Sequence, residues 1–248
     1  MPNTVFSQRA LIRISALDDS EDIRAFLQAL ITQDISTVKQ GKPQWGALLS
    51  PQGKCLFDFI LWADEADILI DCERDAAADL AKKLTLYRLR RKIEIKREEI
   101  LCVHWALKHE SAALDPRLDA LGHRWLAPFM NGDEGVDEEF RAHRLSLGVC
   151  EGANELGFDK ILWLECNAIE LHGVSFDKGC YIGQENTARM NYRGKINRRV
   201  VGVPPAHANP KRQIFAYDDL SIEHRRIDDL EDAHVPDWMT AALENTEA

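Results

Sequence analysis

The order of strand-like and helix-like segments in the first 110 residues limits the possible folds more than any other feature of this sequence. Alternating or continuous apolar runs predict six strands, at 10–16, 45–50, 55–63, 68–72, 92–97 and 100–107. Apolar residues at helical spacing from Ile23 to Ile31 predict one helix, and the Ala- and Leu-rich stretch 75–87 predicts another. The resulting order is β-α-β-β-β-α-β-β. This order favours an α+β fold, with helices on one face of a mainly antiparallel sheet.

The remaining residues give weaker signals. Residues 111–135 are rich in Asp, Gly and Pro and are interpreted as a connector, whereas 137–149 begin with acids and have helical spacing. Strands are predicted at 198–203 and 213–219, and a terminal helix at 236–247. The chain has 248 residues, enough for more than one core. We therefore expect a first α+β domain at 1–110, a second α+β domain at 111–197, and a reduced C-terminal β segment with a terminal helix at 198–248.

Charge is distributed unevenly along the chain. The net charge of −10 argues against stable, direct binding of nucleic acid. Nevertheless, residues 82–97 hold eight Lys or Arg and one acid, and residues 178–199 hold six and one. Two interpretations remain open: two solvated faces, or a positive site on an acidic protein that attracts a small polyanion.

The location of the protein is predicted from signals that the sequence lacks. No stretch approaches the ~18 apolar residues of a membrane span. The N-terminal residues also lack the basic and apolar regions of a secretory signal. We therefore expect no membrane association and a cytoplasmic protein.

One of the six cysteines has an unusual setting. None forms a CxxC pair, and Cys and His residues show no zinc-site spacing, so we expect free thiols and no metal site of the protein's own. Cys180 lies in "KGCYIGQE" (178–185), between Gly179 and Gly183 and two residues after Lys178. Glycines allow a ligand to approach the backbone, and nearby positive charge would lower the thiol pKa. The residues alone leave three roles open for Cys180: nucleophile, soft-metal ligand or turn residue.

The octapeptide 178–185 resembles the signature of the YgfZ family of folate-binding proteins. These proteins are relatives of the aminomethyltransferase of the glycine cleavage system, and they include the Iba-type iron–sulfur cluster assembly factors. Six further segments are similar to the family in the same order, so that the resemblance covers roughly residues 8–203: 26–35, 47–61, 87–95, 115–125, 143–157 and 162–199.

The resemblance implies a fold and a function. The fold would be a ring of two ferredoxin-like α+β domains, followed by a C-terminal β-barrel that is shortened here. Tetrahydrofolate would bind toward the middle of the ring. The protein would support assembly or repair of [4Fe–4S] clusters in client enzymes, including radical-SAM enzymes that modify tRNA. Its partners would be iron–sulfur assembly proteins and those clients, and a [4Fe–4S] cluster would be bound transiently.

The resemblance also implies roles for individual residues. Cys180 would be the reactive residue. The motif loop around it would consist of Lys178, Gly179, Tyr181, Gly183, Gln184 and Glu185. For folate we predict Glu165, whose carboxylate can accept paired N–H bonds from a pterin, and Arg189, which suits the glutamate tail. Tyr192 is a candidate for stacking on the ring.

The alternative function is a folate-dependent aminomethyl transferase, which would be a true enzyme. Ser146 stands in "RLSLG", where the aminomethyltransferases typically carry a carboxylate. We therefore favour the assembly factor over the transferase.

Overall fold

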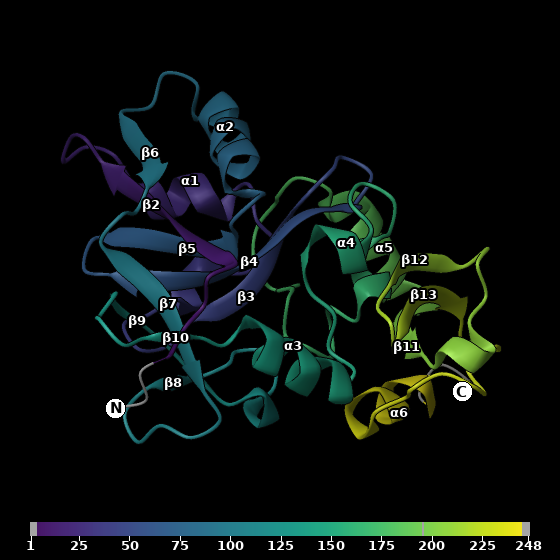
Figure 1. The fold of residues 1–248 in the computed structure, drawn as a ribbon. Helices are drawn as coiled ribbons and strands as arrows, with labels where there is room; N and C mark the ends of the chain where they lie inside the picture. Colours follow the sequence, from purple (N-terminus) through teal and green to yellow (C-terminus); the bar gives the residue numbers. More distant parts are fainter. Residues whose placement is uncertain (1–3, 195, 245–248) are drawn as a thin grey trace.

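The computed structural model describes residues 4–194 and 196–244, and it confirms an α+β fold (Figure 1). A five-stranded antiparallel sheet has the order β3-β4-β5-β2-β6. Its strands are β2 (Arg9–Ala16), β3 (Gln44–Leu49), β4 (Cys55–Asp64), β5 (Asp67–Glu73) and β6 (Ile93–Arg97). Helices α1 (Ile23–Gln28) and α2 (Ala77–Arg88) pack against one face. This order of elements, followed by β7, confirms the prediction for the first 110 residues.

The two faces of this sheet lie against different cores. In β4, Phe59 and Leu61 pack with α1 and α2, whereas Ile60 and Trp62 pack with the second half of the chain. All four side chains are buried. A strand that is covered on both faces has no solvated side, which explains why β4, up to its last residue, is apolar on both faces except at Asp58.

The second part of the chain builds a smaller sheet of order β7-β9-β8, from β7 (Leu101–Ala106), β8 (Ala113–Leu114) and β9 (His123–Pro128). The N-terminal strand β1 (Thr4–Val5) crosses to this side and pairs in parallel with β10 (Glu134–Gly135). The interpretation of 111–135 as a connector is therefore wrong. Its strands are short and interrupted by turn residues, so the sequence shows no alternating run. The predicted domain boundary at 110 falls between β7 and β8 of one sheet, and the division into domains stays a prediction.

Short helices connect these parts. They are α3 (Asp137–Ser146), α4 (Gly152–Leu156) and α5 (Gln184–Tyr192), with single 3₁₀ turns at η1 (Ile35–Thr37), η2 (Asp119–Leu121), η3 (Trp163–Cys166) and η4 (Pro205–His207). The helix predicted at 137–149 is confirmed as α3. None of the helices within 4–194 and 196–244 is long and apolar enough to cross a membrane.

The C-terminal part is a three-stranded sheet of order β11-β13-β12, which lies apart from the large sheet in Figure 1. Strands β11 (Arg198–Val203) and β12 (Gln213–Ala216) confirm two predicted strands. Strand β13 (Ser221–Arg226) was not predicted, because its buried positions Glu223 and Arg225 are charged and pair with each other at 2.9 Å. Helix α6 (Asp237–Glu244) covers the sheet, and the rest of the predicted terminal helix lies outside the described residues.

Candidate functional site

The motif loop, residues 178–185, is tied to the end of α1 by Lys178. Its buried Nζ donates hydrogen bonds to the carbonyl oxygens of Gln28, Ile31 and Gln33, at 2.7, 2.6 and 3.0 Å. Carbonyls at the end of a helix lack partners within the helix, so they need donors from elsewhere. Burial lowers the pKa of Lys178 to about 8. The ammonium group therefore caps α1 and fixes the first residue of the loop.

The other end of the motif loop is fixed by close backbone packing. Gly183 has a φ of +82°, and a Cβ there would lie 2.5 Å from the carbonyl oxygen of Ser50 in the turn between β3 and β4. Gly53 in the same turn has a φ of +81°, and its Cβ would lie 3.2 Å from the Gly183 oxygen. Asn186 of α5 donates to the Gln52 oxygen at 2.9 Å. Both glycines are needed because two backbones touch here.

Between these two anchors, the thiol of Cys180 is exposed. Gly179 is also exposed, and no atom lies within 4 Å of a Cβ built there. The thiols of Cys55, Cys72, Cys150 and Cys166 are buried, and burial raises their pKa, to about 12 for Cys72. Cys180 is therefore the cysteine most open to a partner or a reagent.

The positive charges near the thiol have other partners. The Lys178 ammonium is held by the three carbonyls and lies 4.9 Å from the ring centroid of buried Tyr181. Arg189 of α5 pairs with Glu185 at 3.0 Å on an exposed surface. The geometry therefore does not support a direct electrostatic effect of the Lys178 ammonium on the Cys180 thiol. Its visible role is to hold the loop.

The structure does not gather the predicted folate residues around one cavity. Glu165, on η3, pairs with Nε2 of His224 on β13 at 3.1 Å. Arg189 and Tyr192 lie on α5, and Tyr192 is 93% exposed. The role of these three residues in binding folate stays a prediction.

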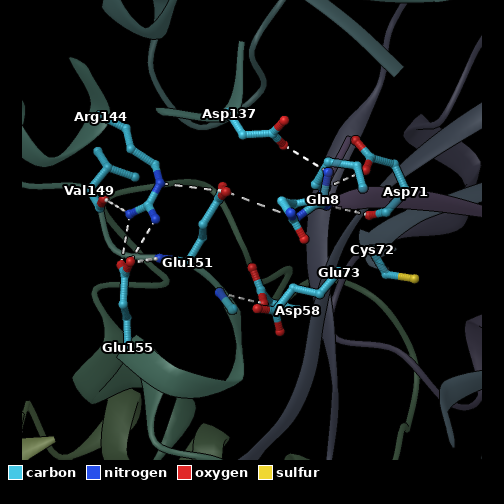
Figure 2. Close-up of polar contacts among 12 residues, drawn as sticks. Gln8, Asp58, Asp71, Cys72, Glu73, Asp137, Arg144, Val149, Glu151 and Glu155 are labelled. Atoms are coloured by element: carbon cyan, nitrogen blue, oxygen red, sulfur yellow. Dashed lines mark hydrogen bonds and ion pairs between the residues drawn. The ribbon is translucent and has the colours of Figure 1, made fainter. Parts of the chain in front are cut away.

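A central cavity of about 180 Å³ lies between the large sheet, α3 and α4, and none of those three residues lines it. Charged side chains surround it (Figure 2). Arg144 donates to both oxygens of Glu155, at 2.6 and 2.7 Å, and its Nε lies 3.5 Å from Glu151. The hydroxyl of Tyr217, from the C-terminal part, donates to Glu155 at 2.6 Å. Groups from all parts of the chain thus line this partly open cavity.

A buried network of ion pairs supports the wall of the cavity. Arg9 pairs with Asp71 at 2.6 Å, Arg124 with Asp115 at 2.7 Å, and Arg117 with Glu151 at 2.6 Å. With Arg144 and Glu155, this makes four arginines and four carboxylates. Burial opposes the ionisation of Glu151, but Arg117 and Arg144 outweigh burial and lower its pKa. Removal of one member would leave an uncompensated charge, which is strongly destabilising.

Two further carboxyl groups near the cavity lack an arginine partner at hydrogen-bonding distance. Asp58 accepts from the backbone N–H of Gly152 at 3.0 Å, and Glu73 from that of Ala153 at 2.7 Å. Burial raises the pKa of both, and in Glu73 the charge of Asp58 adds to this effect. Glu73 lines the cavity. It is therefore a half-buried carboxyl group whose charged form would be stabilised by a ligand with N–H donors.

These cavity residues were not predicted from the sequence, although the sequence contains a signal for them. Asp58 and Asp71 interrupt apolar strands that are buried on both faces. A carboxylate at such a position is rarely tolerated without a partner. Ser146, by contrast, is exposed at the end of α3, where its hydroxyl donates to the His143 oxygen at 2.7 Å. Its lack of a carboxylate therefore does not change the charge of the cavity.

Comparisons with known proteins point to one group of relatives. No family model matches the chain. It is 32% identical over 232 residues to the human iron–sulfur cluster assembly factor IBA57, mitochondrial, covering 79% of this chain and 64% of the relative. It is 29% identical over 233 residues to the Neurospora crassa IBA57 homolog, covering 80% of this chain and 52% of the relative. The chain thus spans between half and two thirds of the length of these relatives.

The relatives are mitochondrial proteins, which contradicts the cytoplasmic location expected from the sequence. Among solved structures, the chain resembles the glycine cleavage system aminomethyltransferase T from Bartonella henselae. The TM-score is 0.60 at 13% identity, over 85% of this chain and 68% of that protein. The fold is therefore that of the aminomethyltransferases.

Proposed function

We propose that this chain is an iron–sulfur cluster assembly factor of the YgfZ and Iba type, and that Cys180 is its reactive residue. The human and Neurospora crassa relatives are cluster assembly factors by name, which supports the class. The observation that carries the proposal is the setting of Cys180. Its thiol is exposed on a loop that is anchored on one side by Lys178 and on the other by Gly183.

An exposed thiol on a fixed loop suits the handling of iron. A thiolate is a ligand that iron–sulfur clusters prefer, and a [4Fe–4S] cluster takes four of them. Within 4–194 and 196–244, no group of three or more Cys, His, Asp or Glu side chains could hold a metal. Cys180 would then supply one ligand, and any cluster bound there would need thiolates from another protein. The cluster is cargo in this proposal, passed between this chain and assembly proteins or client enzymes.

The clients proposed are [4Fe–4S] enzymes, among them radical-SAM enzymes that modify tRNA. Aminomethyl transfer, the alternative function, is not favoured, because the sequence relatives are assembly factors and the aminomethyltransferase shares the fold at only 13% identity.

Tetrahydrofolate is proposed as the small-molecule ligand, and the central cavity as its site, because charged side chains that could bind a pterin ring and an acidic tail line it. Its volume of about 180 Å³ is below the ~300–1,000 Å³ of sites that enclose a whole drug-sized ligand. A bicyclic ring would fit inside, and the tail would lie outside. Glu73 could accept N–H bonds from the ring, and Arg141, at the edge of the cavity, could pair with an acidic tail. When bound, the cofactor would supply a carrier for one-carbon groups.

The function is tested by complementation. In cells that lack the endogenous protein, the activity of a [4Fe–4S] enzyme is measured with the wild-type chain, with Cys180→Ser and with Cys102→Ser. Cys102 is the matched control, because it is a half-buried thiol away from the motif loop. We expect wild type and Cys102→Ser to restore activity and Cys180→Ser not to. Equal rescue by all three would remove Cys180 from the chemistry.

The folate site is tested by calorimetric titration with tetrahydrofolate. Glu73→Gln keeps the acceptor for Ala153 but removes the charge, so binding in the central cavity would weaken by about 1.5–3 kcal/mol. Arg189→Ala would weaken binding by a similar amount if the ligand lies along α5, as predicted from the sequence. An effect of Glu73→Gln alone assigns the cavity, and an effect of Arg189→Ala alone assigns α5. Unchanged affinity in both variants would reject both sites.

A further inference from the structure

A second hollow lies directly beside the motif loop. It is an open, mainly apolar groove of about 780 Å³, and it is distinct from the central cavity. Its lining includes Tyr87 of α2, Pro51 of the β3–β4 turn, and Ile182 and Ala188 from the motif loop and α5. The groove also includes Tyr181, the residue after Cys180. A partner bound in this groove would therefore contact the loop that carries the exposed thiol.

Two exposed leucines lie beside Tyr87 in the sequence, at the end of α2, although neither lines the groove itself. Leu86 is 65% exposed and Leu89 is 82% exposed, on either side of Tyr87. Leu89 ends α2 with a φ of +54° and a ψ of −117°, a backbone conformation that residues other than glycine rarely adopt. Burial in this chain does not explain a leucine at that position. A large side chain held in a strained, exposed conformation is often found where a partner binds.

The charge around this end of α2 is positive. Residues 82–97 carry eight basic residues and one acid, on a chain with a net charge of −10, and three of the eight pair with acids further along β6 or near α1. Lys83 lies 5.8 Å from the ring centroid of Tyr87. Lys82 and Arg90 are exposed and have no acidic partner among the described residues. On the opposite side, Glu185 and Arg189 neutralise each other at 3.0 Å. The groove is therefore apolar with a positive margin along α2.

We propose that this groove binds an amphipathic helix of a partner protein that carries acidic residues beside its apolar face. Open apolar grooves beside helices commonly receive such helices, and charge complementarity selects the partner. This proposal rests on the function proposed above, in which a partner brings thiolate ligands to Cys180. The groove would then be the docking surface that holds the partner's cluster beside the thiol.

Crosslinking tests where the partner binds. The probe is the photoreactive amino acid p-benzoylphenylalanine, placed in the full chain at Tyr87 or, as control, at Ala142, which is exposed on α3. After irradiation in cells, the crosslinked peptides are sequenced by mass spectrometry. We expect position 87, but not 142, to crosslink to an acidic amphipathic segment of an iron–sulfur protein. Crosslinks to a second copy of this chain, or equal crosslinking at both positions, would overturn the proposal.

A variant pair separates the docking surface from the chemistry. Ala188→Glu places a negative charge inside the groove, and Ala142→Glu places the same charge on α3 outside it. We expect Ala188→Glu to reduce the crosslink at position 87 by at least ~30-fold, the factor that matches a ~2 kcal/mol interface hot spot. Ala142→Glu should leave it unchanged, and both variants should keep the wild-type melting temperature.

The outcomes for docking and for function differ. Cys180→Ser should keep the crosslink at position 87 but lose rescue of the [4Fe–4S] enzyme, whereas Ala188→Glu should lose both. If Ala188→Glu retains full rescue while Cys180→Ser loses it, the groove proposal is wrong and the function stands. If Cys180→Ser retains full rescue, the proposed function fails, whatever the groove binds.

Discussion

Two glycines of the same octapeptide should respond in opposite ways to the same substitution. We predict that Gly183→Ala destabilises the protein strongly and that Gly179→Ala does not. At Gly183 the added Cβ would lie 2.5 Å from the carbonyl oxygen of Ser50. That oxygen cannot withdraw easily, because it accepts the N–H of Gly53 at 2.9 Å in a tight turn. At Gly179 the added Cβ would meet no atom within 4 Å.

The size of the effect follows from two terms. A non-glycine residue in the left-handed region costs roughly 1–2 kcal/mol, and Gly183 has a φ of +82°. Overpacking against atoms that cannot move adds about 1–3 kcal/mol. The free energy of unfolding should thus fall by about 2–5 kcal/mol in Gly183→Ala. It should change by less than about 0.5 kcal/mol in Gly179→Ala, as at most surface sites.

Urea denaturation of the wild type and the two variants, monitored by tryptophan fluorescence, measures this difference. In a domain of this size, each kcal/mol corresponds to about 2–4 °C in melting temperature, which gives an independent check. Equal stability of the two variants would refute the argument that Gly183 is a contact glycine. A larger loss in Gly179→Ala would show that the open space beside Cys180 is not open in solution.

Two further predictions concern buried charges. Lys178→Met leaves the carbonyls of Gln28, Ile31 and Gln33 without their donor. We therefore expect the free energy of unfolding, measured by urea denaturation, to fall by about 2–4 kcal/mol. The variant should also rescue the [4Fe–4S] enzyme less well, because the motif loop loses its anchor. Glu151→Gln should cost about 3–5 kcal/mol at pH 7. Because the folded-state pKa of Glu151 is lowered from 4.5, its stabilisation is present above that pH and is lost as pH falls below it; the variant should therefore show a shallower loss of stability below pH 4.5 than the wild type.

Much of the first half of the fold could be predicted because its signals are local. The apolar runs of β4 and β5 and the spacing of α1 depend on burial by neighbouring elements, and the sequence shows that burial directly. The strands β9 and β13 were missed for the opposite reason. Arg124 in β9 and Glu223 in β13 are buried, but their partners lie elsewhere in the fold or within the same strand. A pattern based on hydrophobicity does not predict a strand whose buried positions are charged.

The candidate site was predictable only in part. The octapeptide drew attention to the loop and its cysteine, and the structure places this thiol at the surface. The central cavity depends on tertiary pairing, since Arg9, Glu73, Glu151 and Tyr217 come from four distant segments. No spacing rule connects them. The sequence did contain one indication of a buried polar site, namely an acidic residue such as Asp58 within a strand that is covered on both faces.

The similarity of residues 178–185 to a family motif does not imply that all eight residues take part in the chemistry. Lys178 and Gly183 have roles that packing explains in full: one caps α1, and the other touches the β3–β4 turn. Tyr181 is buried beside the Lys178 ammonium. Cys180 and Gly179, which are exposed and make no such contacts, lie between these anchors. If Cys180 acts as proposed above, a metal ion or a positive group of the partner would stabilise its thiolate on binding. The anchored loop would then present one exposed thiol to that partner.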